Sequence, residues 1–213
     1  GPQRLDPETA VRVSKAANDR LRDICSAQPK RFAGFGMLPT PDPAAAANEL
    51  ERCVNKLGFK GALIHGLTGE ERLFIDDKRF WPIFERAEAL DVPLYIHPAI
   101  PHPDVMNAYF KPYAKDHPGF LTAGWGFTME TATAGIRIIL SGVLEKYPDT
   151  KIILGHLGET LPFLLWRIDL ALNRRGAAGV PFRELFTKHF HVTTSGFFSD
   201  PALLCCIQEM GTD

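Results

Sequence analysis

The stretch Lys151-Ile-Ile-Leu-Gly-His-Leu-Gly-Glu159, which continues as Thr160-Leu-Pro-Phe-Leu-Leu-Trp-Arg167, predicts a strand, a turn and a helix in immediate succession. Residues 151–154 predict a short buried strand. Gly155 and Gly158 follow it, and glycine allows the backbone to turn sharply. The second half of the stretch predicts a helix with a proline in its first turn, where proline is well tolerated. Together these segments form one βα unit of an α/β fold.

His156 lies at the carboxyl end of the predicted strand, where the turn begins. Glu159 and Thr160 are predicted to open the helix that follows. In an α/β barrel, polar residues at the carboxyl ends of strands face the active site. We therefore expect His156 to be a functional group, although a histidine that is merely hydrogen-bonded at a strand end would fit the same pattern.

A second apolar run ends in histidine in the same way, at Val92-Pro-Leu-Tyr-Ile-His97-Pro98. Two buried strands that both finish in histidine indicate side chains that converge on one site. The five predicted strands lie at residues 32–38, 62–65, 93–97, 151–154 and 190–194. Helices with apolar stripes separate them, a pattern that predicts a parallel sheet. Residues 66–76 are predicted to be a polar loop.

Composition limits the kinds of function. The sequence of 213 residues has a formal net charge of -1 and a hydrophobic content of 45%, which is enough for one sizeable domain. No basic field favours nucleic acid or an anionic membrane surface, and no apolar run approaches the length of a membrane span. The four cysteines lack the spacing of zinc or redox motifs. This pattern favours a reducing compartment, and we expect a cytoplasmic location.

Motifs along most of the chain carry a resemblance to a known family. They are Tyr95-Ile-His-Pro98, Gly155-His-Leu-Gly-Glu159, Leu161-Pro-Phe-Leu-Leu-Trp-Arg-Ile-Asp169, Arg31-Phe-Ala-Gly-Phe35 and Thr193-Thr-Ser-Gly196. Together they resemble the amidohydrolase-related superfamily (amidohydrolase 2), in the branch that contains metal-dependent aromatic-acid decarboxylases and aminocarboxymuconate-semialdehyde decarboxylase. The resemblance implies a TIM-type (β/α)8 barrel, of which residues 1–213 would form a single incomplete domain with about five strands. The first two strands would lie upstream of Gly1 and the last strand beyond Asp213.

The resemblance also implies roles for individual residues. His97 would be a ligand of one divalent metal, Zn or Mn. His156 would be a catalytic residue near that metal. Apart from the resemblance, the position of Glu159 one turn away would let it hydrogen-bond an imidazole nitrogen and fix its tautomer. The structural alternatives are a strand-end histidine for His97 and a helix first-turn carboxylate for Glu159. His65, which also ends a predicted strand, has no matching motif and is expected to be a site-wall or structural residue.

Residues 98–127 interrupt the regular alternation of strands and helices and are rich in proline and aromatic residues. We expect a long loop that covers the site, because it leaves from the carboxyl end of a strand. Trp125 and Phe127 are candidates to sandwich an aromatic substrate. The alternative is that these two side chains pack the interior of the loop.

The function that the resemblance implies is metal-dependent, non-oxidative decarboxylation of a small (hydroxy)aromatic or related carboxylic acid. The metal would hold the substrate carboxylate and a neighbouring hydroxyl, and protonation of the ring carbon would release carbon dioxide. The alternatives are a metal-dependent hydrolase of an amide, lactone or ester on the same scaffold, and an inactive fragment or binding piece. Ala99 follows His97-Pro98 where several decarboxylases of the family have arginine, which leaves the substrate class open. The resemblance further implies a homodimer or homotetramer.

Overall fold

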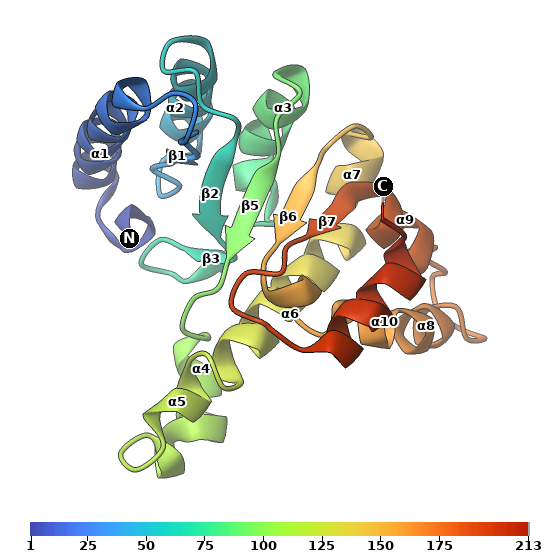
Figure 1. The fold of residues 1–213 in the computed structure, drawn as a ribbon. Coiled ribbons are helices and arrows are strands. Elements are labelled where there is room, and N and C mark those ends of the chain that lie inside the picture. Colours follow the sequence, from blue (N-terminus) through green and yellow to red (C-terminus); the bar gives the residue numbers. More distant parts are fainter. Residues whose placement is uncertain (213) are drawn as a thin grey trace.

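Five short parallel strands form the centre of the molecule (Figure 1). The fold is that of a computed structural model, which describes residues 1–212. The strands are β1 (Gly36–Met37), β2 (Ala62–His65), β5 (Leu94–His97), β6 (Ile152–Leu154) and β7 (Phe190–Val192). Their order in the sheet, β1-β2-β5-β6-β7, follows the order of the chain. In a doubly wound sheet the strand order reverses at a switch point, whereas in a barrel consecutive strands are neighbours. This sheet therefore has the topology of part of a barrel wall.

Helices connect the strands and cover the sheet (Figure 1). The longer helices are α1 (Pro7–Ala27), α2 (Pro43–Asn55), α3 (Trp81–Ala89), α6 (Gly126–Leu140), α8 (Leu161–Leu172), α9 (Phe182–His189) and α10 (Asp200–Met210). The shorter ones are η1 (Pro2–Arg4), η2 (Lys78–Phe80), α4 (Pro103–Val105), η3 (Met106–Phe110), η4 (Lys111–Tyr113), α5 (Pro118–Leu121), α7 (Val143–Lys146) and η5 (His156–Gly158). In the described part of the chain, none of these helices has the length and apolar character that a membrane crossing requires.

The two faces of the sheet differ in burial, because side chains alternate along a strand. Ile64, Ile96 and Leu154 belong to the core that packs against the helices, and all three are fully buried. Leu63 and Tyr95 precede the first two of these residues, point to the opposite face and are half-buried. In a complete barrel this second face is the packed interior. The five strands therefore form an open wall whose edges are β1 and β7.

The first strand is shorter than predicted. The sequence predicts a strand over residues 32–38, but only Gly36–Met37 pair with β2. The N–H of Phe32 donates instead to the carbonyl oxygen of Gln28 at 3.1 Å, in a turn that follows α1. This local turn keeps the start of the predicted strand out of the sheet.

Two segments predicted as loops contain regular structure. Residues 66–76 include a small antiparallel hairpin of β3 (Leu67–Thr68) and β4 (Leu73–Phe74). Residues 98–127 hold four short helices, α4, η3, η4 and α5, rather than a long loop. Their aromatic side chains pack on one another, with the rings of Phe110 and Phe120 centred 4.9 Å apart. The helical segment extends beyond the carboxyl ends of β2 and β5 (Figure 1).

Candidate active site

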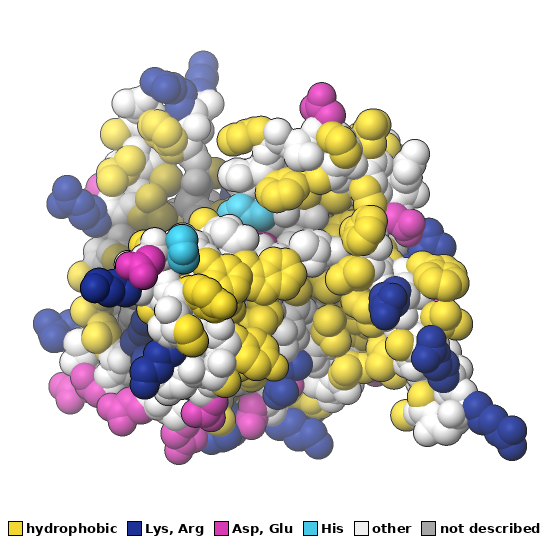
Figure 2. Space-filling view, turned by 90° about the horizontal axis from the view of Figure 1, so that it is seen from below, with side chains coloured by type: hydrophobic (Ala, Val, Ile, Leu, Met, Phe, Trp, Pro, Cys, Tyr) yellow, Lys and Arg dark blue, Asp and Glu magenta, His cyan; other side chains and the backbone are white. Residues whose placement is uncertain are grey.

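The carboxyl ends of neighbouring strands bring histidines to one edge of the sheet. β2 ends at His65, β5 ends at His97, and His156 follows β6 after a single glycine. His65 and His97 are partners in the parallel register, and their rings lie edge to face with centroids 5.5 Å apart. Figure 2 looks onto this end of the molecule, where histidine side chains lie among hydrophobic ones.

Hydrogen bonds define the tautomers of His97 and His65. His97 Nδ1 lies 2.9 Å from the carbonyl oxygen of Pro98, which only accepts, so Nδ1 carries the proton. The lone pair is then on Nε2, as in many metal-ligating histidines. His65 Nδ1 donates to the carbonyl oxygen of His97 at 2.8 Å, and burial lowers the pKa of His65. His65 is therefore a neutral histidine that supports the end of β5.

Residues 156–160 form a left-handed turn directly after β6. Their φ angles are 51° at His156, 54° at Leu157, 73° at Gly158, 53° at Glu159 and 68° at Thr160. This conformation costs a residue other than glycine about 1–2 kcal/mol, so the surrounding structure must hold the turn. One such contact is the hydrogen bond from the N–H of Leu157 to the carbonyl oxygen of Thr193, at 2.8 Å. The turn is thereby tied to the chain that follows β7.

The turn corrects the predicted start of the helix. Glu159 and Thr160 do not open it, because α8 begins at Leu161 and Thr160 is its N-cap residue. Glu159 is therefore not a helix first-turn carboxylate. Its side chain is 2% exposed and turns back to His156, with Oε1 2.5 Å from Nδ1. The hydrogen bond expected between Glu159 and an imidazole nitrogen is confirmed.

Glu159 sets the proton arrangement of His156. A carboxylate oxygen accepts, so Nδ1 donates its proton to Oε1 in a hydrogen bond. Nε2 is then the ring nitrogen that can exchange a proton with a ligand. Within residues 1–212, Nδ1 is the one ring nitrogen of His156 with a hydrogen-bond partner. A side chain at Gly196 would come within 3.3 Å of Nε2, so this glycine keeps the space beside the ring open. An imidazole held by a buried carboxylate, with its second nitrogen open, can act as a general acid or base.

A cavity of about 820 Å³ lies beside this pair. Its walls include His156, Glu159, Trp125 and Phe127, so the structure brings four of the predicted site residues together. The two aromatic side chains come from the start of α6 and the residue before it. Aromatic and apolar walls with a few convergent polar groups are typical of a site for a small ring-shaped ligand. His97 is not among the residues that line this cavity.

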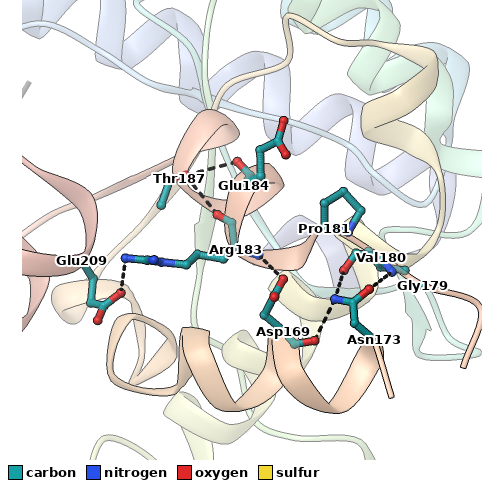
Figure 3. A pocket seen from close by; sticks show the side chains of 9 residues that line it. All are labelled: Asp169, Asn173, Gly179, Val180, Pro181, Arg183, Glu184, Thr187 and Glu209. Carbon is teal, nitrogen blue, oxygen red and sulfur yellow. Dashed lines mark hydrogen bonds and ion pairs between the residues drawn. The ribbon is translucent and has the colours of Figure 1, made fainter. Parts of the chain in front are cut away.

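A second cavity, of about 680 Å³, lies between α8, α9 and α10 (Figure 3). Its polar side chains bind one another. Asn173 makes hydrogen bonds of 2.8 and 3.0 Å with the carbonyl oxygen and N–H of Val180. Asp169 accepts from the N–H of Arg183 at 3.1 Å, and the Arg183 guanidinium pairs with Glu209 at 3.0 Å. The polar side chains of this cavity are therefore paired with one another and connect the helices. We place the candidate active site at the first cavity, which contains the His156–Glu159 pair.

Comparison with known proteins identifies the family. The family described as Amidohydrolase matches residues 2–213. The chain belongs to the amidohydrolase family. It is 40% identical over 217 residues to the gamma-resorcylate decarboxylase of Rhizobium sp. (strain MTP-10005), an alignment that covers 98% of this chain and 65% of the relative. This amidohydrolase chain therefore spans about 65% of the length of these curated relatives.

Solved structures confirm the fold. A dihydroxybenzoic acid decarboxylase from Polaromonas sp. JS666, with bound manganese and the inhibitor 2-nitroresorcinol, has a TM-score of 0.90 at 40% identity, covering 99% of this chain and 65% of that chain. A 2,6-dihydroxybenzoate decarboxylase complexed with 2,6-dihydroxybenzoate has a TM-score of 0.88 at 39% identity, covering 99% of this chain and 66% of that chain. The predicted family and the predicted partial (β/α)8 barrel are both confirmed.

The described residues of this amidohydrolase provide part of a metal site. With Nδ1 on the Pro98 carbonyl, His97 leaves Nε2 as the ring nitrogen that could bind Mn or Zn. Within residues 1–212, however, no three His, Cys, Asp or Glu side chains are grouped so that they could hold a metal ion. Because protein metal sites commonly use three or more such ligands, a complete site would need donors in addition to these.

Two polar features near the site were not predicted. The hydroxyl of Tyr95 lies 3.3 Å from Thr193 Oγ1 and 3.4 Å from Ser195 Oγ, and these two oxygens are 2.8 Å apart. Strand periodicity could have indicated Tyr95, because it lies two residues before His97 and so shares its face of β5. Glu130 is the second feature. Its carboxyl group lies on the buried face of α6, where an acidic residue is unusual.

Proposed function

We propose that the full-length protein is a metal-dependent, non-oxidative decarboxylase of a small hydroxyaromatic carboxylic acid, and hence a carboxy-lyase. The observation that carries the proposal is the pair of His156 and Glu159, which leaves the imidazole Nε2 open beside a cavity with aromatic walls. Relatives near 40% identity that are named as decarboxylases of dihydroxybenzoates support the substrate class.

His156 would move the proton in this reaction. Glu159 accepts from Nδ1 and stabilises the imidazolium form while Nε2 carries a proton. Nε2 then delivers that proton to the ring carbon that bears the carboxylate. The bond between this carbon and the carboxylate breaks, its electron pair restores the aromatic ring, and carbon dioxide leaves. Trp125 and Phe127 would flank the ring and hold its plane beside the imidazole.

We propose His97 as the ligand that this chain gives to one divalent metal, Mn or Zn. The manganese in the Polaromonas structure supports Mn. When bound, the metal supplies positive charge that clamps the substrate carboxylate and a neighbouring hydroxyl. The tautomer of His97, with Nδ1 on the Pro98 carbonyl, leaves Nε2 as the donor atom. Further ligands would come from outside residues 1–212.

A metal-dependent hydrolase of an amide, lactone or ester is the second candidate. The description of the family as Amidohydrolase favours it, and the same His156–Glu159 pair could take a proton from water. Product analysis of the metal-loaded full-length protein separates the two. Carbon dioxide from 2,6-dihydroxybenzoate or related hydroxybenzoates is the expected result. A new carboxylic acid from a panel of amides, lactones and esters would favour the hydrolase, and no product from either panel would favour an inactive binding protein.

We also propose that the protein forms homodimers or homotetramers in the cytoplasm. Phe163, Trp166 and Leu170 lie on one face of α8 and are exposed, and an apolar ridge of this kind supports an interface. All four cysteines are free thiols, which supports a reducing compartment. Analytical ultracentrifugation of the full-length protein should give a dimer or tetramer mass. A monomer at micromolar concentration would contradict the oligomer.

A further inference from the structure

A buried carboxyl group lies behind the end of β5, on Glu130 of α6. The residue is 3% exposed, and α6 otherwise buries mostly apolar or small residues, such as Ala134 and Ile138. Burial raises the pKa of Glu130 to about 7, and the charge of Glu159 acts in the same direction. Keeping an ionisable group in such surroundings is unfavourable unless its polar atoms are used. The contacts of one carboxyl oxygen, Oε2, show how it is used.

One peptide group links this carboxyl to the imidazole of His97. Glu130 Oε2 accepts hydrogen bonds from the N–H of Ala99 at 3.3 Å and from Thr131 Oγ1 at 3.2 Å. The N–H of Ala99 and the carbonyl of Pro98 are the two ends of the same peptide bond. That carbonyl accepts from His97 Nδ1 at 2.9 Å. Imidazole, peptide group and carboxyl therefore form a continuous chain of hydrogen bonds.

The other carboxyl oxygen reaches the neighbouring strand. Glu130 Oε1 has no hydrogen-bond partner within residues 1–212. It packs against Gly66, the residue directly after β2, where a Cβ atom would lie only 2.5 Å away. Glu130 thus occupies the space between the ends of β2 and β5, the two strands that carry His65 and His97. The carboxyl group is held against both strand ends rather than pointing into solvent.

We propose that Glu130 is a positioning residue for His97. Through the peptide group between Pro98 and Ala99, it fixes the tautomer with the proton on Nδ1, so that Nε2 would be the nitrogen that binds the metal. A carboxyl group that accepts from a peptide N–H polarises the peptide and strengthens its carbonyl as an acceptor. Metal-ligating histidines are commonly oriented by a carboxylate or by a backbone carbonyl, and here the two act in series. This inference rests on the proposed role of His97 as a metal ligand.

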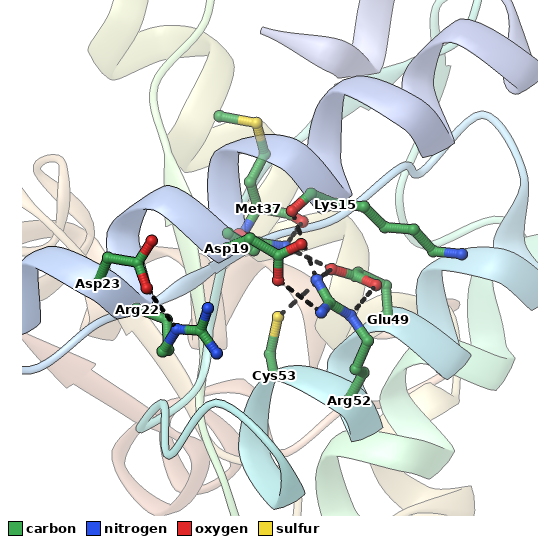
Figure 4. Close-up of polar contacts among 9 residues, drawn as sticks. Lys15, Asp19, Arg22, Asp23, Met37, Glu49, Arg52 and Cys53 are labelled. Carbon is green, nitrogen blue, oxygen red and sulfur yellow. Dashed lines mark hydrogen bonds and ion pairs between the residues drawn. The ribbon is translucent and has the colours of Figure 1, made fainter. Parts of the chain in front are cut away.

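Binding of Mn²⁺ to the full-length protein, measured by calorimetry, tests the inference without reference to turnover. Glu130→Met removes the polar atoms at similar side-chain length and is expected to weaken binding by about 10- to 100-fold. Glu130→Gln keeps an acceptor oxygen and is expected to weaken binding less. The matched control is Glu49→Gln. Glu49 is similarly buried, at 2% exposed, and binds Asn18 of α1 and Arg52 of α2. Figure 4 shows its contact with Arg52, and because this cluster lies on α1 and α2, Glu49→Gln should leave Mn²⁺ binding unchanged.

His97→Ala separates the two claims. If His97→Ala binds Mn²⁺ like the wild type, the proposed ligand is wrong. If it loses binding while both Glu130 variants bind like the wild type, only the positioning role of Glu130 is wrong. Should Glu130→Met fail to fold, nitrogen-15 NMR of His97 in the metal-free wild type and in Glu130→Gln decides the question. We expect the Nδ1-protonated tautomer in the wild type and a weaker preference in the variant, and an identical preference in both would overturn the inference.

Discussion

At the scale of single residues, the buried carboxylate of Glu159 controls what His156 can do. Nδ1 is occupied by the 2.5 Å hydrogen bond to Oε1, so Nε2 is the atom that exchanges a proton with whatever fills the cavity. A positioned acid–base group of this kind typically contributes about 10²- to 10⁴-fold to a rate. The proposed reaction therefore depends on the open Nε2 of this imidazole.

Replacing His156 by alanine in the full-length protein should lower turnover by about 10²- to 10⁴-fold and leave the metal content unchanged. The metal is retained because His97, not His156, is the proposed ligand. Steady-state rates and elemental analysis of the same preparation measure both quantities. His189→Gln is the control, because His189 Nδ1 donates to the carbonyl oxygen of Thr150 at 2.9 Å near the amino ends of β6 and β7, and its loss should reduce stability but not turnover. Normal turnover in His156→Ala would make His156 a structural residue.

Glu130 should make stability depend on pH. Its pKa is raised from 4.5 to about 7 in the folded protein, mainly by burial, so the folded state holds this proton more tightly than the unfolded state. The resulting stabilisation is complete below pH 4.5 and is lost as the pH rises to 7, a change of about 3 kcal/mol. Urea unfolding can compare the metal-free wild type with Glu130→Gln at each pH. Between pH 4.5 and 7 the wild type should lose about 3 kcal/mol of unfolding free energy relative to the variant. A difference that stays constant from pH 4.5 to 7 would contradict the raised pKa.

At the scale of elements, local sequence signals predicted some parts and missed others. β2, β5 and β6 were predicted because each is a short apolar run that ends at or near a histidine. α9 was not predicted. It is stabilised by tertiary packing, in which the ring of Phe186 stacks on that of Phe190 with centroids 4.7 Å apart. The turn after β6 was predicted from Gly155 and Gly158, but the positive φ angles of His156 and Leu157 were not, because residues other than glycine rarely adopt them. Their conformation depends on a hydrogen bond to Thr193, which lies far along the chain.

Gly158→Ala tests how strongly the turn is held. Gly158 has a φ angle of 73°, and a Cβ atom there would lie 2.9 Å from both Pro162 Cδ and Val192 Cγ1. Left-handed strain and overpacking together should lower the free energy of unfolding by about 2–5 kcal/mol. Gly176→Ala is the matched control, because its φ angle is 90° but nothing lies within 4 Å, so it should lose only about 1–2 kcal/mol. Denaturant unfolding measures both, and an equal loss in the two variants would show that the turn is not packed as described.

At the scale of the whole molecule, topology predicted which residues meet and side-chain packing determined how. Strands that run parallel place their carboxyl ends on one edge, so the pairing of β5 with β6, and hence the common edge at which His97 and His156 follow their strands, agrees with the sequence pattern. Trp125 and His156 line one cavity because α6 starts beside the turn. The sequence did not predict where α6 starts, because the long segment before it has no regular pattern. The role of Glu130 depends on the rotation of α6 about its axis, since only one face brings a carboxyl group to Ala99. The apolar residues of α6 indicate which face is buried, but they do not predict that Glu130 lies on that face.

The inner face of the open wall belongs to the same scale. Leu63, Tyr95 and Ile153 are half-buried there, whereas the interior of a complete barrel is filled by side chains. The relatives that match are longer than this chain, which covers 65% of the first of them. Tests of activity and metal binding therefore belong to the full-length protein, in which we propose that this face is closed.

The measurement that tests the central proposal most directly is the fate of the carboxyl carbon. Metal-loaded full-length protein would be incubated in D₂O with 2,6-dihydroxybenzoate labelled with carbon-13 in its carboxyl group. We predict labelled carbon dioxide, together with one deuteron on the ring carbon that carried the carboxylate, and the loss of both in His156→Ala. An unchanged substrate with a full complement of metal, across a panel of hydroxybenzoates, would contradict the decarboxylase.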